Sequence, residues 1–323
     1  MYIKELKIGD VKVKNNLILA PMAGVTDSAF RKICVKYGVG LVVSEMVSAK
    51  GIVYGDKKTL ELIQMDIPNM PRMVQIFGSE PDIMSKAIKI IEDKVDIIDI
   101  NMGCPVPKIV SNGEGSALLK NPKLIGEIVK ACVNATTKPV TVKIRIGFED
   151  NSINAKEIGQ IIQDNGAKML TIHGRTRSQY YAGNVNLDVI KEVKETLKIP
   201  VIGNGNVIDY ESFKKMIDYT NVDGVMIGRA TLGNPWIFED ILNQDEGKEK
   251  REVSNEEKLE QIIEQYNLED EYKGEYTAVR EMRKHIGWYL KGLPNSAEIK
   301  NRINQMESKE EIIELLKKIL CRH

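Results

Sequence analysis

The sequence is poor in the residues that usually build metal centres and disulfide frameworks. Its 323 residues include four cysteines and three histidines, and no two cysteines form a CxxC pair. Cysteines this far apart argue against a zinc or iron–sulfur site and against a disulfide framework. We therefore expect no metal, and we expect reduced thiols at Cys34, Cys104, Cys132 and Cys321.

Long apolar runs are also missing. Residues 1–10 alternate charged and apolar side chains, which is not the pattern of a signal peptide. No later segment offers the roughly 18 uncharged apolar residues of a membrane span. The sequence thus predicts a cytoplasmic protein with no membrane partner.

What the chain does contain is typical of a globular protein. Hydrophobic residues make up 42% and charged residues 28%, and 46 basic residues balance 46 acidic ones. This composition excludes a disordered chain. Because one α/β barrel takes about 200 to 250 residues, the chain is long enough for a barrel and a smaller second domain.

Eight short β-rich runs recur along the first 230 residues, with segments of helical periodicity between them. The runs cover residues 17–22, 41–47, 72–78, 97–103, 140–147, 169–175, 200–207 and 224–230. Eight such βα units predict an α/β fold of the (β/α)8 TIM-barrel type. A doubly wound sheet is the alternative, but no GxGxxG motif follows the first run.

Polar side chains share one parity within these runs. Lys143 and Arg145 alternate with isoleucines, and Asp99 and Asn101 do the same in the preceding run. Side chains of one parity point into a barrel, where charged groups are costly unless they face a partner. The polar interior, which includes Gln75, Asp99, Asn101, Thr141, Lys143, Arg145, Thr171 and His173, therefore predicts a bound polar cofactor.

Two glycine-bearing loops lie where TIM barrels commonly bind phosphate. Gly203-Asn204-Gly205-Asn206 follows the seventh run, and Gly228-Arg229 follows the eighth. Backbone amides in such loops bind phosphate, and Arg229 would add a charged donor. Gly and Asn also form ordinary turns, so the first motif is weak alone. Together the loops favour a cofactor with one phosphate and a large planar ring, FMN more naturally than NAD.

The fourth run ends in a loop that presents a thiol. Residues 97–102 are mostly apolar and open directly into Gly103-Cys104-Pro105. A free cysteine is most often simply packed in a core, so Cys104 alone is no evidence of chemistry. In the first βα loop, residues 20–27, small residues and a proline would let the backbone approach a ligand, and Thr26 is expected to cap the next helix.

The alternation of β-rich and helical segments ends near Asn243, and beyond it the charged residues are unevenly distributed. Residues 239–275 hold fourteen acidic and five basic residues, whereas residues 276–305 hold six basic and two acidic. On a helix, Arg280, Arg283, Lys284 and Lys291 would share one face suited to a phosphate backbone, although a merely solvated face is the alternative. We predict a barrel over residues 1–243 and a small all-α domain over residues 244–323.

The combination and order of these motifs resemble the tRNA-dihydrouridine synthases, particularly their bacterial B-type branch. The segments are APMAGVTDSAFR at 20–31, QIFG at 75–78, DINMGCP at 99–105, GSALLKNP at 115–122, VKIRIG at 142–147, TIHGRTRSQYYAG at 171–183, GNGNV at 203–207 and RKHIGWYLKGLP at 283–294. This resemblance implies an FMN-binding TIM barrel followed by a helical tRNA-binding domain, with NADPH as electron donor.

The resemblance also implies roles for individual residues. FMN would be held by Pro21, Met22, Ala23, Gln75, Lys143, His173, Asn204, Gly205, Asn206, Gly228 and Arg229. Cys104 would be the proton donor, Asn101 would orient the uracil, and Arg175 would contact the substrate. The tRNA would meet Arg280, Arg283, Lys284 and Lys291. NADPH would reduce FMN, and hydride would then pass from N5 to uracil C6 while Cys104 protonates C5.

Two other functions remain open at this point. An FMN barrel dehydrogenase that acts on a free dihydropyrimidine or dihydroorotate would explain the barrel but not the basic C-terminal helices. A non-enzymatic tRNA-binding protein would explain those helices without a flavin. The chain also departs from the family pattern in two places, at Asn206, where many relatives carry Asp, and at Val185-Asn186-Leu187 in place of Ala-Asp-Trp, which is expected to alter the start of the next helix.

Overall fold

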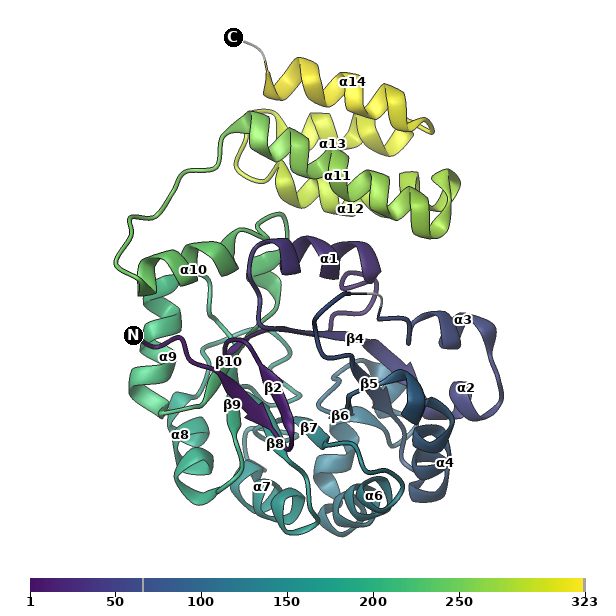
Figure 1. Ribbon diagram of the computed structural model, residues 1–323, viewed down its shortest axis with the longest axis vertical. Helices are drawn as coiled ribbons and strands as arrows, with labels where there is room; N and C mark the ends of the chain where they lie inside the picture. Colours follow the sequence, from purple (N-terminus) through teal and green to yellow (C-terminus); the bar gives the residue numbers. More distant parts are fainter. Residues whose placement is uncertain (66, 322–323) are drawn as a thin grey trace.

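The computed structural model describes residues 1–65 and 67–321, and its larger part is a closed barrel of eight parallel strands (Figure 1). The strands are β3 (Leu17–Leu19), β4 (Leu41–Ser48), β5 (Met73–Phe77), β6 (Ile97–Met102), β7 (Val140–Arg145), β8 (Met169–His173), β9 (Val201–Asn204) and β10 (Gly224–Ile227). Strand β10 pairs with β3 and closes the ring. Each strand overlaps one predicted run, so the TIM barrel is confirmed.

A short antiparallel hairpin covers the N-terminal end of the barrel. It consists of β1 (Leu6–Ile8) and β2 (Val11–Val13). Its buried side chains pack with the lowest layer of interior residues, which includes Leu41, Met73 and Ile97. The hairpin was not predicted, because three-residue strands are too short to show a period of two. This apolar plug fills the N-terminal end of the barrel, so polar interior side chains are left to the opposite, C-terminal end of the strands.

Helices cover the outside of the barrel and pack on the outward-facing side chains. The helices are α1 (Ser28–Lys36), α2 (Ala49–Val53), α3 (Lys57–Glu61), α4 (Pro81–Ile91), α5 (Pro107–Val110), α6 (Pro122–Asn134), α7 (Ala155–Asp164), α8 (Leu187–Thr196), α9 (Tyr210–Thr220) and α10 (Ile237–Asp245). In α4 the buried residues Met84, Ala87, Ile88 and Ile91 follow the 3.6-residue period of a helix. No helix in the described part of the chain is long and apolar enough to cross a membrane.

Two helices, α1 and α8, begin differently from what the sequence led us to expect. Asp27, not Thr26, caps α1, because its carboxylate accepts the Phe30 amide at 3.0 Å. The Thr26 hydroxyl instead accepts the Met22 amide and ties the loop to itself. Helix α8 starts normally despite its unusual sequence, since the Asn186 side chain caps it.

The C-terminal part forms a separate helical layer above α1 and α10 (Figure 1). Its helices are α11 (Asn255–Lys273), α12 (Glu275–Tyr289), α13 (Ser296–Gln305) and α14 (Lys309–Leu320). They enclose their own apolar core, to which Trp236 from the end of the barrel contributes. The expected division after residue 243 falls within the last turn of α10. The expected helices beyond the barrel are present, whereas the boundary after residue 243 stays a prediction.

Candidate active site

The C-terminal half of the barrel interior is lined by a chain of hydrogen-bonded polar groups. Asp99 accepts hydrogen bonds from Gln75 Nε2 at 2.6 Å and from Thr141 Oγ1 at 2.5 Å. Gln75 Oε1 in turn accepts from Asn101 Nδ2 at 2.7 Å. The parity argument is thus confirmed, and this network fixes the amide orientations of Gln75 and Asn101.

The loop that carries Cys104 is held from two sides. The Asn101 side-chain oxygen accepts the backbone amides of Gly103, at 3.1 Å, and Cys104, at 2.9 Å. Arg145 Nε donates to the Gly103 carbonyl at 2.9 Å, and the Ser116 amide donates to the Cys104 carbonyl. Asn101 therefore lies inside the barrel as expected and positions the cysteine. A uracil contact by Asn101 stays a prediction.

The Cys104 thiol lies at the top of β6 and is only 8% exposed. Burial raises the pKa of Cys104 above its usual value, and this outweighs the opposing effects of the Val106 amide, Arg145 and Lys143. The thiol therefore keeps its proton at neutral pH. A protonated thiol held by a rigid loop is suited to act as a general acid rather than as a nucleophile.

Lys143 projects into the same interior without a partner. Its ammonium forms no ion pair or hydrogen bond with any residue in the described ranges. Burial, followed by repulsion from Arg145, lowers its pKa to about 8, while Asp99 and Cys104 act in the opposite direction. An unpaired, poorly solvated cation at the mouth of a barrel is costly, so this side chain fits an electron-rich ligand.

His173 and Arg175 lie together at the end of β8. Burial and the surrounding cations, first Lys143, strongly lower the pKa of His173, so its ring is neutral. Arg175 Nη1 lies 3.3 Å from His173 Nε2, which must accept because a guanidinium only donates. Arg175 is buried and also donates to carbonyls of its own loop and to Asn206 Oδ1, at 2.7 Å. These bonds join the β8 and β9 loops, and a substrate contact by Arg175 stays a prediction.

The two expected phosphate loops have backbone conformations and free amides that suit an anion. Gly205 and Asn206 both have positive φ, 122° and 56°. A Cβ on Gly205 would lie 2.8 Å from Val185 and 3.2 Å from His173, so only glycine fits there. Within the described residues, the backbone amides of Gly205, Asn206 and Gly228 donate to no protein acceptor. Free backbone amides of this kind fit a phosphate group.

Other predicted cofactor residues surround the same opening. Pro21 and Met22 are half-buried and Ala23 is exposed in the loop that precedes α1. Gly228 approaches this loop closely, since a Cβ on it would lie 3.3 Å from Ala20 and 3.6 Å from Met22. Asn204 is buried and donates to the Met226 carbonyl at 2.7 Å, so it joins β9 to β10. The donor set as a whole fits an anionic cofactor with one phosphate.

One residue near the opening, Tyr181, was not predicted as a site residue. The Tyr181 ring is 49% exposed and lies beneath the guanidinium of Arg229, at 4.7 Å, and that of Arg145, at 5.6 Å. Its centroid is 6.3 Å from that of His173. Tyr181 belongs to the family-like segment of residues 171–183, but the sequence does not show in which direction an aromatic side chain in a loop points.

The basic residues of the helical domain do not all share one face. Arg280 is exposed and stacks on Tyr276, whereas Arg283 donates to the Met306 carbonyl at 2.7 Å and so joins α12 to the end of α13. Lys291 is exposed but lies beyond the end of α12. Lys284 lies closest to the barrel, because its Nζ would be 3.8 Å from a Cβ built on Gly24.

The closed barrel and its polar open end place the protein among the (β/α)8-barrel enzymes. The chain belongs to the dihydrouridine synthase family, whose model matches residues 18–322. The family resemblance seen in the sequence is therefore confirmed.

Curated relatives match over almost their whole length. A probable tRNA-dihydrouridine synthase of Rickettsia bellii is 40% identical over 98% of this chain and 99% of its own. The tRNA-dihydrouridine synthases B of Vibrio parahaemolyticus and Shewanella oneidensis are 41% and 42% identical, over 96% and 95% of this chain and 97% and 95% of their own.

A solved structure supports the fold alone. The 6-hydroxypseudooxynicotine amine oxidase of Pseudomonas geniculata N1 has a TM-score of 0.58 and 14% identity, and the match covers 76% of this chain and 49% of that protein.

Proposed function

We propose that this protein reduces uridines in tRNA to 5,6-dihydrouridine, with FMN as the bound cofactor and NADPH as electron donor. The observation that carries the proposal is the pair formed by Lys143, an ammonium without a partner, and Cys104, a protonated thiol, at one barrel opening. Membership of the dihydrouridine synthase family and the names of the curated relatives support the tRNA substrate.

The reaction adds hydrogen across the C5–C6 double bond of uracil. The bound flavin would supply the hydride to C6. Cys104 Sγ would donate its proton to C5, and Asn101 keeps the thiol in place through the two loop amides that it binds. General acid catalysis of this kind contributes about 10² to 10⁴-fold. The target base must leave the RNA stack to reach the barrel, at a cost of a few kcal/mol.

Purified protein should be yellow and should release FMN on denaturation. The free amides of Gly205, Asn206 and Gly228 and the unpaired Lys143 are the basis of this expectation. The absorption spectrum and chromatography of the released flavin test it. Release of a different flavin would refute the FMN assignment, and a colourless, flavin-free protein that binds tRNA would favour the non-enzymatic alternative.

Unmodified tRNA should oxidise the reduced enzyme, and mapping of dihydrouridine should show sites missing in tRNA from cells that lack the gene. Oxidation by free uracil or orotate but not by tRNA would instead identify a free-base dehydrogenase. These outcomes separate the two enzymatic alternatives, because both share the barrel and only tRNA reduction explains Arg280 and Lys284.

Charge reversal at Arg280 and Lys284 should weaken tRNA binding. Both side chains are outside the helical core, and loss of phosphate contacts should reduce affinity and also the salt dependence of binding. Arg283 is a poor choice for this test because its reversal would disturb α13. The exposed Lys215 on α9 provides the matched control, Lys215→Glu. Equal affinities for the double variant and the control would show that this face is only solvated.

A further inference from the structure

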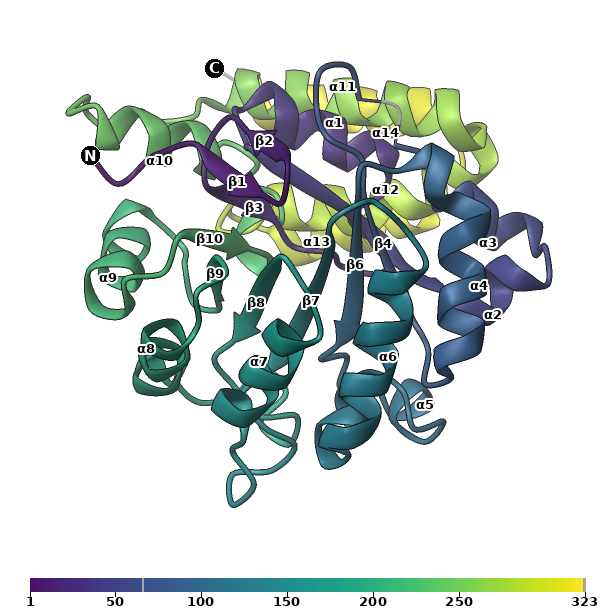
Figure 2. The same cartoon turned by 60° about the horizontal axis from the view of Figure 1, so that its bottom comes forward.

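The helical domain contacts the barrel along α1, beside which α11 runs (Figures 1 and 2). Part of this contact is aromatic, because Trp236 and Tyr37 pack with the core of the helical domain. Polar contacts accompany it: Tyr37 donates to Gln261 Oε1 at 2.6 Å, and Lys36 pairs with Glu264. The polar contacts along α11 add direction to the packing, since a hydrogen bond or ion pair needs a specific partner in a specific geometry.

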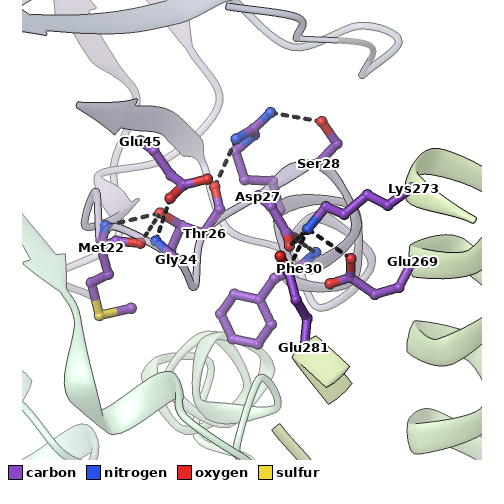
Figure 3. Close-up of polar contacts among 11 residues, drawn as sticks. Met22, Gly24, Thr26, Asp27, Ser28, Phe30, Glu45, Glu269, Lys273 and Glu281 are labelled. Atoms are coloured by element: carbon purple, nitrogen blue, oxygen red, sulfur yellow. Dashed lines mark hydrogen bonds and ion pairs between the residues drawn. The ribbon is translucent and has the colours of Figure 1, made fainter. Parts of the chain in front are cut away.

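Lys273, at the C-terminal end of α11, makes the most connected of these contacts (Figure 3). Its ammonium lies 2.5 Å from Asp27 Oδ2, 2.6 Å from Glu281 Oε2 and 2.9 Å from Glu269 Oε2. Asp27 belongs to the barrel, while Glu269 and Glu281 belong to α11 and α12. One side chain thus joins the first βα loop of the barrel to two helices of the second domain.

Three carboxyls surround the single ammonium of Lys273. Burial and the neighbouring Asp27 raise the pKa of Glu269, which favours the protonated form of this carboxyl. Burial opposes ionisation of Asp27, but Glu269 and Lys273 outweigh it and lower the pKa of Asp27. The ammonium occupies the position that a metal ion would take among these three carboxyls. Lys273 is therefore a half-buried ionic partner of the buried Asp27 carboxylate.

Asp27 transmits this contact to the barrel opening. Its Oδ1 caps α1 while its Oδ2 binds Lys273, so one carboxylate serves both purposes. The preceding loop is fixed from the barrel side by Glu45, which accepts the Gly24 amide (Figure 3). On the helical side, Lys284 of α12 lies over Gly24. The separation between α12, which carries Lys284, and the barrel opening therefore depends on the contacts of Lys273.

We propose that Lys273 is a positioning residue that locks the helical domain to the first βα loop and so aligns bound tRNA with the barrel opening. This inference rests on the proposed function as a tRNA reductase. Lys273 itself touches neither the thiol nor the phosphate loops; it acts through Asp27 and through the helix that carries Lys284.

Lys273→Met tests the proposal, because it keeps the length of the side chain and removes the charge. The KM for tRNA should rise on the order of tenfold or more, since the buried Asp27 carboxylate loses its half-buried partner, while kcat changes by no more than about twofold. Trypsin should also cut faster at the exposed Lys248 and Lys250, in the segment that connects α10 to α11. Lys309→Met is the matched control, because Lys309 pairs with Asp270 inside the helical domain.

A second variant, Asp27→Asn, guards against a folding defect. Asparagine caps helices as well as aspartate does, so only the interdomain charge is lost. Combined with Lys273→Met it should raise the KM no further than the single variants, because both break the same contact.

Two results would refute the proposed role of Lys273. The first is that Lys273→Met and Asp27→Asn both fold and show the same KM and the same trypsin cleavage rates as the Lys309→Met control. The second is that their effects on KM add in the double variant. Absence of tRNA reduction by the unmodified protein would refute the proposed function instead. In that case the trypsin cleavage rates still test the contact between the two domains, and unchanged rates in both variants would refute it.

Discussion

Replacing Cys104 by alanine should abolish dihydrouridine formation while leaving the flavin bound and its reduction by NADPH intact. The thiol combines a proton retained at neutral pH with a place on the loop that follows β6. Loss of a positioned general acid should cost about 10² to 10⁴-fold in the rate of uridine reduction. Single-turnover measurements with pre-reduced enzyme and unmodified tRNA separate this step from reduction by NADPH.

The pH dependence of the same step gives an independent check. Because burial raises the pKa of Cys104, the protonated form persists through neutral pH, and the rate should fall only in alkaline solution, above the ordinary thiol value. Cys321→Ala is the control, since Cys321 directly follows α14, the last helix of the helical domain. Normal tRNA reduction by Cys104→Ala would exclude the thiol as the acid.

The barrel could be predicted from the sequence because each of its signals is local. Runs such as residues 140–147 carry both the β-rich composition and the parity that separates Lys143 from the outward isoleucines, and both were confirmed. The β1–β2 hairpin was not predicted because its strands have three residues each. Asp27 and Thr26 are equally good caps in sequence, and only the path of the loop decides between them.

The candidate site could be predicted less completely, because its contacts join distant parts of the chain. Arg175 and Arg283 look like free cations in the sequence, yet each donates to backbone carbonyls that the fold brings near. The pairing of Asp27 with Lys273 spans 246 residues, and no periodicity connects two such positions. The residue types were enough to predict which side chains belong to the candidate site. Their hydrogen-bond and ion-pair partners could not be predicted, because they depend on how distant elements such as α1, α11 and α12 pack together.

Lys143→Met should reduce the affinity of the flavin-free protein for FMN on the order of 10²-fold. Two unit charges 4 Å apart interact by about 4 kcal/mol at an effective dielectric of 20, which sets the upper range of the loss. The Lys143 ammonium forms no ion pair or hydrogen bond with any residue in the described ranges, and Asp99 compensates only part of the cost of its burial, so much of its charge is available to an anionic ligand. The polar network of Gln75, Asp99 and Thr141 should keep the barrel folded in the variant.

The dependence of FMN affinity on pH distinguishes this charge effect from a loss of shape. The pKa of Lys143 is lowered to about 8 by burial, so below that value the ammonium is already present when the ligand arrives. Above it, the lysine must take up a proton on binding, and affinity should fall by up to about tenfold per pH unit. Lys143→Met should lose this dependence, whereas Lys168→Met, at the other end of the barrel, should retain it. The same pH slope in both variants would mean that another group receives the proton, and that Lys143 does not hold the flavin through its charge.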